Sequence, residues 1–269
     1  AYIPYLQNQK LTRSIWLAFS HDEEVGCLGA APIAQSLIEK QAKPGLVVIG
    51  EPTMMHLIDA HKGILSFETI VTGREAHSSM PEQGVNAVML MGELLATLNQ
   101  IAADARTVTD TNFASVTPYA SVHVGVVNGG TARNIVPRHC RIAWEVRPLP
   151  STDVQTLLKP FHAKVAKLEA QMQKIDVSCG IITNQLTNVR GLHAVDEEAP
   201  HMALAYRLSN ANRADAVAFG AEGGIFQGAG FPVIVCGPGS IDQAHQPNEF
   251  VSREQLALGA AFMQRLAEG

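Results

Sequence analysis

Two adjacent glutamates, Glu23 and Glu24, stand in the segment SHDEEVG at residues 20–26, between an apolar run and a helix-like stretch. Such a pair can divide two tasks, since one carboxylate can bind a metal while the other takes a proton from bound water. Neighbouring side chains of an extended chain point in opposite directions, so only a turn could bring both into one site. An exposed acidic turn, stabilised by the dipole of the next helix, also explains the pair. The pair alone therefore leaves a metal site and a surface turn open.

Glu51 and His245 are further candidates because each follows a short apolar run that is typical of a buried strand. Carboxylate oxygen and imidazole nitrogen are both ligands of zinc. Pro52 fixes the backbone after Glu51, which would help a ligand carboxylate keep one direction. A turn acid at a sheet edge and a solvated loop histidine are the alternatives. Together with Glu24, these residues make three candidate metal ligands.

His77, Asn134 and Arg147 lie in loops or at strand ends in the middle of the chain. An imidazole at His77 could donate a hydrogen bond to a developing oxyanion, or could instead cap the next helix. Arg147 offers a forked donor for a substrate carboxylate, and Asn134 could orient the same group. A turn asparagine and a surface arginine are the alternatives. Glu222 lies in the glycine-rich segment 220–224, and the sequence of this segment does not indicate a role for it.

The flanking segments predict an α/β domain that would hold these residues. Residues 11–20 end in an unbroken apolar run that favours a buried strand, residues 25–40 favour a helix, and residues 46–50 favour a second strand. A strand, a helix and a strand at this spacing predict a parallel sheet, whose ligands gather at the carboxyl ends of its strands. Helices are also expected at 201–210 and 253–267, with a strand at 232–236.

The middle of the chain predicts a second domain of the ferredoxin-like type. Its expected order is β-α-β-β-α-β, from strands at 64–72, 114–127, 141–147 and 175–182 and helices at 85–102 and 157–172. We therefore predict an α/β domain from residues 1–62 and 184–269, interrupted by an α+β domain over residues 63–183.

The composition of the chain indicates what kind of molecule it binds. The 269 residues carry a formal net charge of -5, without a basic cluster for nucleic acid and without an apolar run long enough to cross a membrane. The four cysteines are widely separated, which fits reduced thiols in the cytoplasm. A small organic molecule is the expected partner. The first residue is Ala1, and we expect the chain to begin partway through a longer protein.

The ordered motifs resemble those of the metal-dependent amidohydrolase and peptidase family that includes deacetylases, desuccinylases and aminoacylases of amino acids. The resemblance covers nearly the whole chain and rests on residues 20–26, 50–53, 61–63, 73–84, 129–137 and 237–247. It implies a zinc-peptidase-like α/β catalytic domain with an inserted dimerisation, or lid, domain. It also implies two zinc ions in the complete site, for which cobalt can substitute, and a homodimer formed through the lid.

The resemblance assigns a role to each candidate. Glu23 would be the general base, Glu24 and His245 would bind one metal, and Glu51 would bind the other. His77 would reach into the partner's site and polarise the scissile carbonyl, while Asn134 and Arg147 would hold the substrate. The implied reaction removes an acyl group from an N-acyl amino acid, with N-acetylornithine of arginine biosynthesis as the expected substrate.

Two departures from the family pattern bear on this assignment. The family's first histidine ligand and its bridging aspartate precede the glutamate pair and have no counterpart after Ala1, so the chain alone is expected to be inactive. Ala221 stands before Glu222 where the family pattern has a threonine. A desuccinylase, an aminoacylase or a dipeptidase would keep the same metal motifs. A non-catalytic dimerisation or substrate-binding piece is the alternative from another class.

Overall fold

The computed structural model describes residues 3–7 and 10–268, which divide into two compact units. Unit 1 contains residues up to Lys62, the short segment Asn112–Val116 and the chain from Val189 onward. Unit 2 contains Gly63–Thr111 and Thr117–Asn188. The predicted fold class, an α/β domain with an inserted ferredoxin-like α+β domain, is confirmed.

Unit 1 is built on a mixed four-stranded sheet in the order β1-β10-β2-β9. These strands are β1 (Val47–Ile49), β2 (Ile58–His61), β9 (Asp215–Val217) and β10 (Val233–Val235). β1 pairs with β10 in parallel, whereas β10 and β2 are antiparallel. The helices of the unit are α1 (Ile3–Gln7), α2 (Ala30–Glu39), α5 (Pro200–Ser209), α6 (Gly223–Gly228) and α7 (Arg253–Glu268), and a 3₁₀ turn covers Ile241–Gln243.

The core of unit 1 lies between this sheet and the pair α5 and α7. Its buried members are Leu57, Met202, Ala205, Leu208, Ile234, Cys236 and Phe262. α2 packs against α6, which in turn contacts β10. The buried strands therefore fix the loops that follow β1 and β10 at one edge of the sheet.

The predicted strand at residues 11–20 is wrong. This segment forms no ladder in the structure, and its large apolar side chains are exposed, with Trp16 at 60% and Phe19 at 84% of full exposure. An apolar run forms a strand only when a neighbouring backbone accepts its hydrogen bonds, and no strand within residues 10–268 pairs with it. The predicted parallel β-α-β arrangement fails with it, because β1 has β10 as its neighbour and the sheet is mixed. The helix predicted from residue 25 begins only at Ala30, after a turn.

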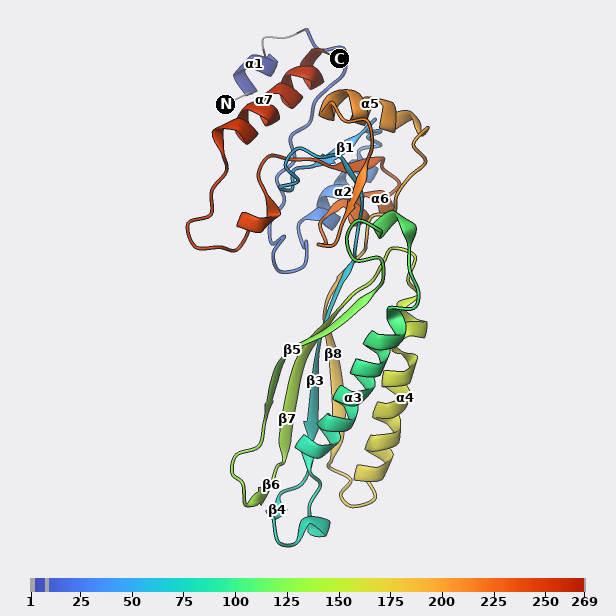
Figure 1. Ribbon diagram of the computed structural model, residues 1–269, viewed down its shortest axis with the longest axis vertical. Coiled ribbons are helices and arrows are strands. Elements are labelled where there is room, and N and C mark those ends of the chain that lie inside the picture. Colours follow the sequence, from blue (N-terminus) through green and yellow to red (C-terminus); the bar gives the residue numbers. More distant parts are fainter. Residues whose placement is uncertain (1–2, 8–9, 269) are drawn as a thin grey trace. The chain divides into compact units, whose positions relative to one another are not determined.

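Unit 2 is a four-stranded sheet in the order β5-β7-β3-β8 with two helices on one face (Figure 1). Its elements are β3 (Ile64–Thr72), α3 (Ala87–Ala105), β5 (Ser121–Gly129), β7 (His139–Arg147), α4 (Val154–Met172) and β8 (Gly180–Val189). The short strands β4 (Ala76–His77) and β6 (Ile135–Val136) form a separate ribbon, and 3₁₀ turns cover Pro81–Gln83 and Thr111–Phe113.

The core of unit 2 follows from the alternation of buried residues along β3 and β7. Because successive strand residues face opposite sides, every second residue of these strands points at the helices. Trp144 of β7 stacks on Phe67 of β3 with ring centroids 4.3 Å apart, and the ring of Phe161 of α4 lies 4.9 Å from that of Trp144. None of the helices described is both long and apolar enough to span a bilayer.

Candidate active site

The two glutamates sit in a tight turn, as the metal-site hypothesis requires. The backbone N–H groups of Gly26 and Cys27 both donate to the Glu23 carbonyl, at 3.0 and 2.9 Å. Gly29 N–H closes the turn onto the His21 carbonyl at 3.0 Å. Gly26 has a φ of 118°, a conformation that a residue with a side chain rarely adopts. The turn replaces the extended backbone that would have separated the two carboxylates.

Glu24 and His245 come together across a long stretch of sequence. His245 Nε2 lies 3.4 Å from Glu24 Oε2, and both side chains are largely exposed. The two groups that were predicted to share one metal are therefore neighbours in space. Their exposure leaves room for a further ligand at this pair.

Glu51 lies at the same sheet edge as the loop that carries His245. β1 and β10 run in parallel, so the residues that follow them emerge together. The loops are joined by backbone hydrogen bonds from Thr53 N–H to the Gly237 carbonyl at 3.1 Å and from Met54 N–H to the Gly239 carbonyl at 2.7 Å. Thr53 adds a side-chain contact, since its hydroxyl accepts from Gly237 N–H at 3.2 Å. The structure thereby fixes the backbone on both sides of the predicted ligand.

Burial and mutual repulsion shape the charges of the site. The pKa of Glu51 is raised to about 7, first by burial and then by the negative charges of Glu23, Glu222 and Glu24. The pKa of Glu23 is also raised, mainly by burial, although the Cys27 thiol opposes the shift by donating to Glu23 Oε1 at 3.5 Å. Burial and these carboxylates raise the pKa of the Cys27 thiol well above its usual range. The cluster is thus short of positive charge, which a cation would supply.

Glu222 is a site residue whose position the sequence did not predict. It is only 8% exposed, and its Oε1 atom is buried without a hydrogen-bond partner among the described residues. The glycine-rich segment around it was a weak signal, because the two glycines that follow allow close packing against neighbouring backbone. The acidic cluster therefore has four carboxylates, Glu23, Glu24, Glu51 and Glu222.

The donors of this cluster suit a metal of the zinc type. Carboxylate oxygens with an imidazole nitrogen are zinc ligands, and the orphaned Glu222 oxygen and the raised pKa of Glu51 show uncompensated acceptors. Within residues 3–7 and 10–268, no three His, Cys, Asp or Glu side chains are arranged so that they could hold an ion. The structure thus brings Glu24 to His245, and the third predicted ligand, Glu51, interacts with Glu24 through charge.

His77 and Asn134 lie next to one another in unit 2. The β4–β6 ribbon pairs His77 with Ile135, and Ser78 N–H donates to the Asn134 carbonyl at 3.0 Å. His77 Nδ1 accepts from the backbone N–H of Ser79 at 3.2 Å and also contacts the Ser79 hydroxyl at 2.7 Å. In a neutral imidazole the proton must then reside on Nε2. His77 is exposed, so this Nε2–H can donate to a carbonyl oxygen outside the unit.

Arg147 lies apart from this pair and already holds a carboxylate. Its guanidinium donates to both oxygens of Glu145, at 3.0 and 3.2 Å. Arg147 ends β7, while the β4–β6 ribbon lies near the start of that strand (Figure 1). At about 3.3 Å per residue, the nine-residue strand separates the two ends by about 26 Å. Within one copy of unit 2, Arg147 therefore does not join His77 and Asn134 around one small molecule.

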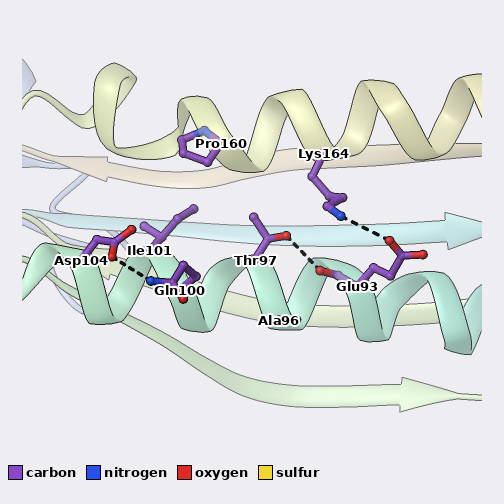
Figure 2. Close-up of a pocket in the computed structure, with 8 residues that line it drawn as sticks. All are labelled: Glu93, Ala96, Thr97, Gln100, Ile101, Asp104, Pro160 and Lys164. Carbon is purple, nitrogen blue, oxygen red and sulfur yellow. Dashed lines mark hydrogen bonds and ion pairs between the residues drawn. The ribbon is translucent and has the colours of Figure 1, made fainter.

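A groove between α3 and α4 contains none of the predicted site residues. Its cavity of about 340 Å³ is lined by residues of both helices, and its polar groups pair with one another (Figure 2). Lys164 of α4 reaches Glu93 of α3 at 3.3 Å, and Gln100 donates to Asp104 at 2.8 Å. Lys164 and Glu93 compensate each other's charge, whereas Asp104 is hydrogen-bonded to a neutral amide and keeps its negative charge.

Comparison with known proteins finds a matching domain and similar folds. Residues 59–173 match the family described as peptidase dimerisation domain. Among solved structures, aminopeptidase PepT from Bacillus cereus superposes with a TM-score of 0.67 at 19% identity, covering 89% of this chain and 61% of that one. A dinuclear metal binding peptidase from M20 family, the YXEP protein of Bacillus subtilis, gives 0.60 at 14% identity and covers 93% and 63%. The likeness to these two peptidases shows the fold of this chain.

The more specific similarity is to acetylornithine deacetylases. The chain is 32% identical to the enzyme of Proteus mirabilis over 98% of its own length and 65% of the relative's, and 30% identical to that of Myxococcus xanthus over 97% and 66%. It thus spans about two thirds of the length of these relatives. The resemblance predicted from the motifs is confirmed as a similarity to the acetylornithine deacetylases.

Proposed function

We propose that this chain supplies the base and metal ligands of a zinc-dependent amidohydrolase that converts N-acetylornithine and water to ornithine and acetate. The observation that carries the proposal is the acidic cluster, in which Glu24 meets His245 at 3.4 Å and Glu51 has a raised pKa. The similarity to acetylornithine deacetylases over 98% of the chain supports the choice of substrate.

Each candidate then has one role. Glu24, Glu51 and His245 would hold the metals, which when bound supply Lewis acidity at the amide carbonyl and lower the pKa of a water molecule. Glu23 would accept a proton from the attacking water and would pass it to the leaving amine. Burial raises the pKa of Glu23, which makes its carboxylate a stronger base than a solvated one.

Unit 2 would contribute the remaining groups. We infer that it forms a homodimer and that His77 polarises the carbonyl in the partner's site through its Nε2–H. Asn134 would contact the substrate beside His77, because the backbone N–H of Ser78 is hydrogen-bonded to the Asn134 carbonyl. Arg147 would have to give up its hydrogen bonds to Glu145 before it could bind the substrate carboxylate. This proposal makes unit 1 the catalytic domain and unit 2 the dimerisation lid. The buried free thiols fit a location in the cytoplasm.

The test is the substitution Glu23→Gln in the full-length protein. We expect unchanged zinc content by metal analysis and a loss of N-acetylornithine hydrolysis by several orders of magnitude. Glu24→Gln should instead lower zinc content, which separates the base from the ligand. Near-normal turnover in Glu23→Gln would overturn the assignment. Parallel assays with N-succinyl-diaminopimelate, N-acetylmethionine and a dipeptide distinguish the related hydrolases, and no turnover of any of them would favour a non-catalytic binding role.

A further inference from the structure

Glu222 is the carboxylate for which the proposed reaction has no use. It is more than nine-tenths buried, and Oε1 has no hydrogen-bond partner in the part of the chain that the structure describes. Burying a carboxylate without a partner is strongly unfavourable, so such a group marks a place where something else completes the structure. A ligand that carries a positive charge would do so.

The backbone around Glu222 is held rigidly. Gly224 N–H donates to His61 Nε2 at 3.2 Å, and His61 Nδ1 lies 2.9 Å from the carbonyl of Lys62. A side chain at Gly224 would stand 2.2 Å from the Arg190 carbonyl oxygen, so the helix start is pressed against neighbouring backbone. The backbone next to Glu222 is therefore held in place by these contacts.

Glu222 belongs to the acidic cluster, where its negative charge acts on Glu23 and Glu51. Of the four carboxylates, Glu23 is assigned as the base and Glu24 and Glu51 as ligands, which leaves Glu222 for the substrate. An alkylammonium brings three N–H donors and a single charge, which matches one buried acceptor oxygen.

We propose that Glu222 is a specificity-determining residue that pairs with the terminal ammonium of the substrate side chain. The inference rests on the proposed function and extends it, because it selects N-acyl amino acids whose side chains end in a primary amine. A neutral side chain of the same length would leave Glu222 Oε1 buried without a hydrogen-bond partner. A site built around a polar partner rejects an analogue that lacks it far more strongly than it rejects a change of one methylene.

The experiment measures equilibrium binding of L-ornithine and L-norvaline, which differ only in the terminal ammonium, to the zinc-loaded full-length protein by titration calorimetry. We expect the wild type to bind ornithine about 10- to 100-fold more tightly than norvaline, the range of one charged hydrogen bond. Glu222→Gln should reduce this preference to about threefold or less and leave norvaline affinity unchanged. Glu254→Gln, the same change at an exposed position of unit 1, should keep the preference.

Three results would overturn the inference. Equal affinities for the two amino acids in the wild type, or no binding of ornithine, would show that the ammonium is not recognised. Equal losses for both ligands in Glu222→Gln would indicate a structural role, and loss of zinc from that variant would make Glu222 a metal ligand. Failure of the proposed function is distinct: the Glu222-dependent preference would be present, but N-acetylornithine would not be hydrolysed.

Discussion

His61 Nε2 accepts a hydrogen bond from the backbone N–H of Gly224 at 3.2 Å, and this contact joins the end of β2 to the first turn of α6. Since that nitrogen is an acceptor, the imidazole proton resides on Nδ1, which donates to the Lys62 carbonyl at 2.9 Å. His61 is fully buried, and burial lowers its pKa to about 4. A neutral histidine is thus a structural element beside the acidic cluster.

The first prediction is that this histidine makes the fold sensitive to acid. Between pH 6.5 and 4, His61 is protonated in the unfolded chain but neutral in the folded chain. The contribution of His61 to the free energy of unfolding is therefore complete above pH 6.5 and declines as the pH falls. The full shift corresponds to about 3 kcal/mol of unfolding free energy. Urea unfolding at pH 7 and pH 4.5 measures it.

The variant His61→Gln isolates this effect, because Gln retains an acceptor for Gly224 N–H and does not titrate. We expect it to be less stable than the wild type at pH 7 and to lose much of that disadvantage at pH 4.5. His139→Gln, at an exposed position of β7, should show a difference from the wild type that does not change with pH. A constant difference for His61→Gln would contradict the prediction.

A second prediction concerns two helical glycines in opposite surroundings. An added Cβ at Gly224 would lie 2.2 Å from the Arg190 carbonyl oxygen, whereas one at Gly92 of α3 would meet nothing within 4 Å. Gly224→Ala should therefore destabilise the protein by about 2–3 kcal/mol through overpacking. Gly92→Ala should stabilise it by about 0.5–1 kcal/mol, because alanine restricts the unfolded chain and favours the helix. The urea midpoints of the two variants measure these changes in stability. Equal changes in Gly224→Ala and Gly92→Ala would refute the steric argument.

A third prediction concerns the polar contact inside the core of unit 2. Trp144 Nε1–H donates to the buried hydroxyl of Thr69 at 3.0 Å, and that hydroxyl also lies 3.0 Å from the hydroxyl of Thr183. Thr69→Val keeps the shape of the side chain but leaves the indole N–H of Trp144 without an acceptor. This should lower the free energy of unfolding by about 1–3 kcal/mol. Thr69→Ser keeps the hydroxyl and serves as the control. If the valine variant proved as stable as the serine variant, the hydrogen bond would carry no weight.

The sequence predicted unit 2 better than unit 1, for a physical reason. β3 was predicted at 64–72, its observed range, and Gly73 marks its end in the sequence. β2 and β9 were missed because they are four and three residues long and contain Asp59, His61 and Asp215. The apolar run at 11–20 failed because hydrophobicity records a tendency to be buried and not the presence of a pairing strand.

The site was predictable in its chemistry and less so in its geometry. The type and order of Glu24, Glu51 and His245 indicated a metal site, but no spacing could give the 3.4 Å approach of Glu24 to His245. The pairing of Arg147 with Glu145 was readable in principle, because residues two apart in a strand share a face. The burial of Glu222 depends on the contacts of α6 with distant backbone, which the sequence does not display.

The last prediction tests whether His77 acts in the partner's site. Mixing Glu23→Gln and His77→Gln variants of the full-length protein under subunit exchange should restore about a quarter of wild-type activity, because half of the dimers are mixed and one site of each then has both residues. If His77 acted within its own subunit, each site of a mixed dimer would lack one residue and no activity would return. N-acetylornithine turnover before and after mixing measures this. His139→Gln, the matched control, should be active without mixing. The recovered site would use the Nε2–H group of His77, because Nδ1 accepts a hydrogen bond from Ser79. His77→Ala should therefore regain activity on mixing with Glu23→Gln, as His77→Gln does.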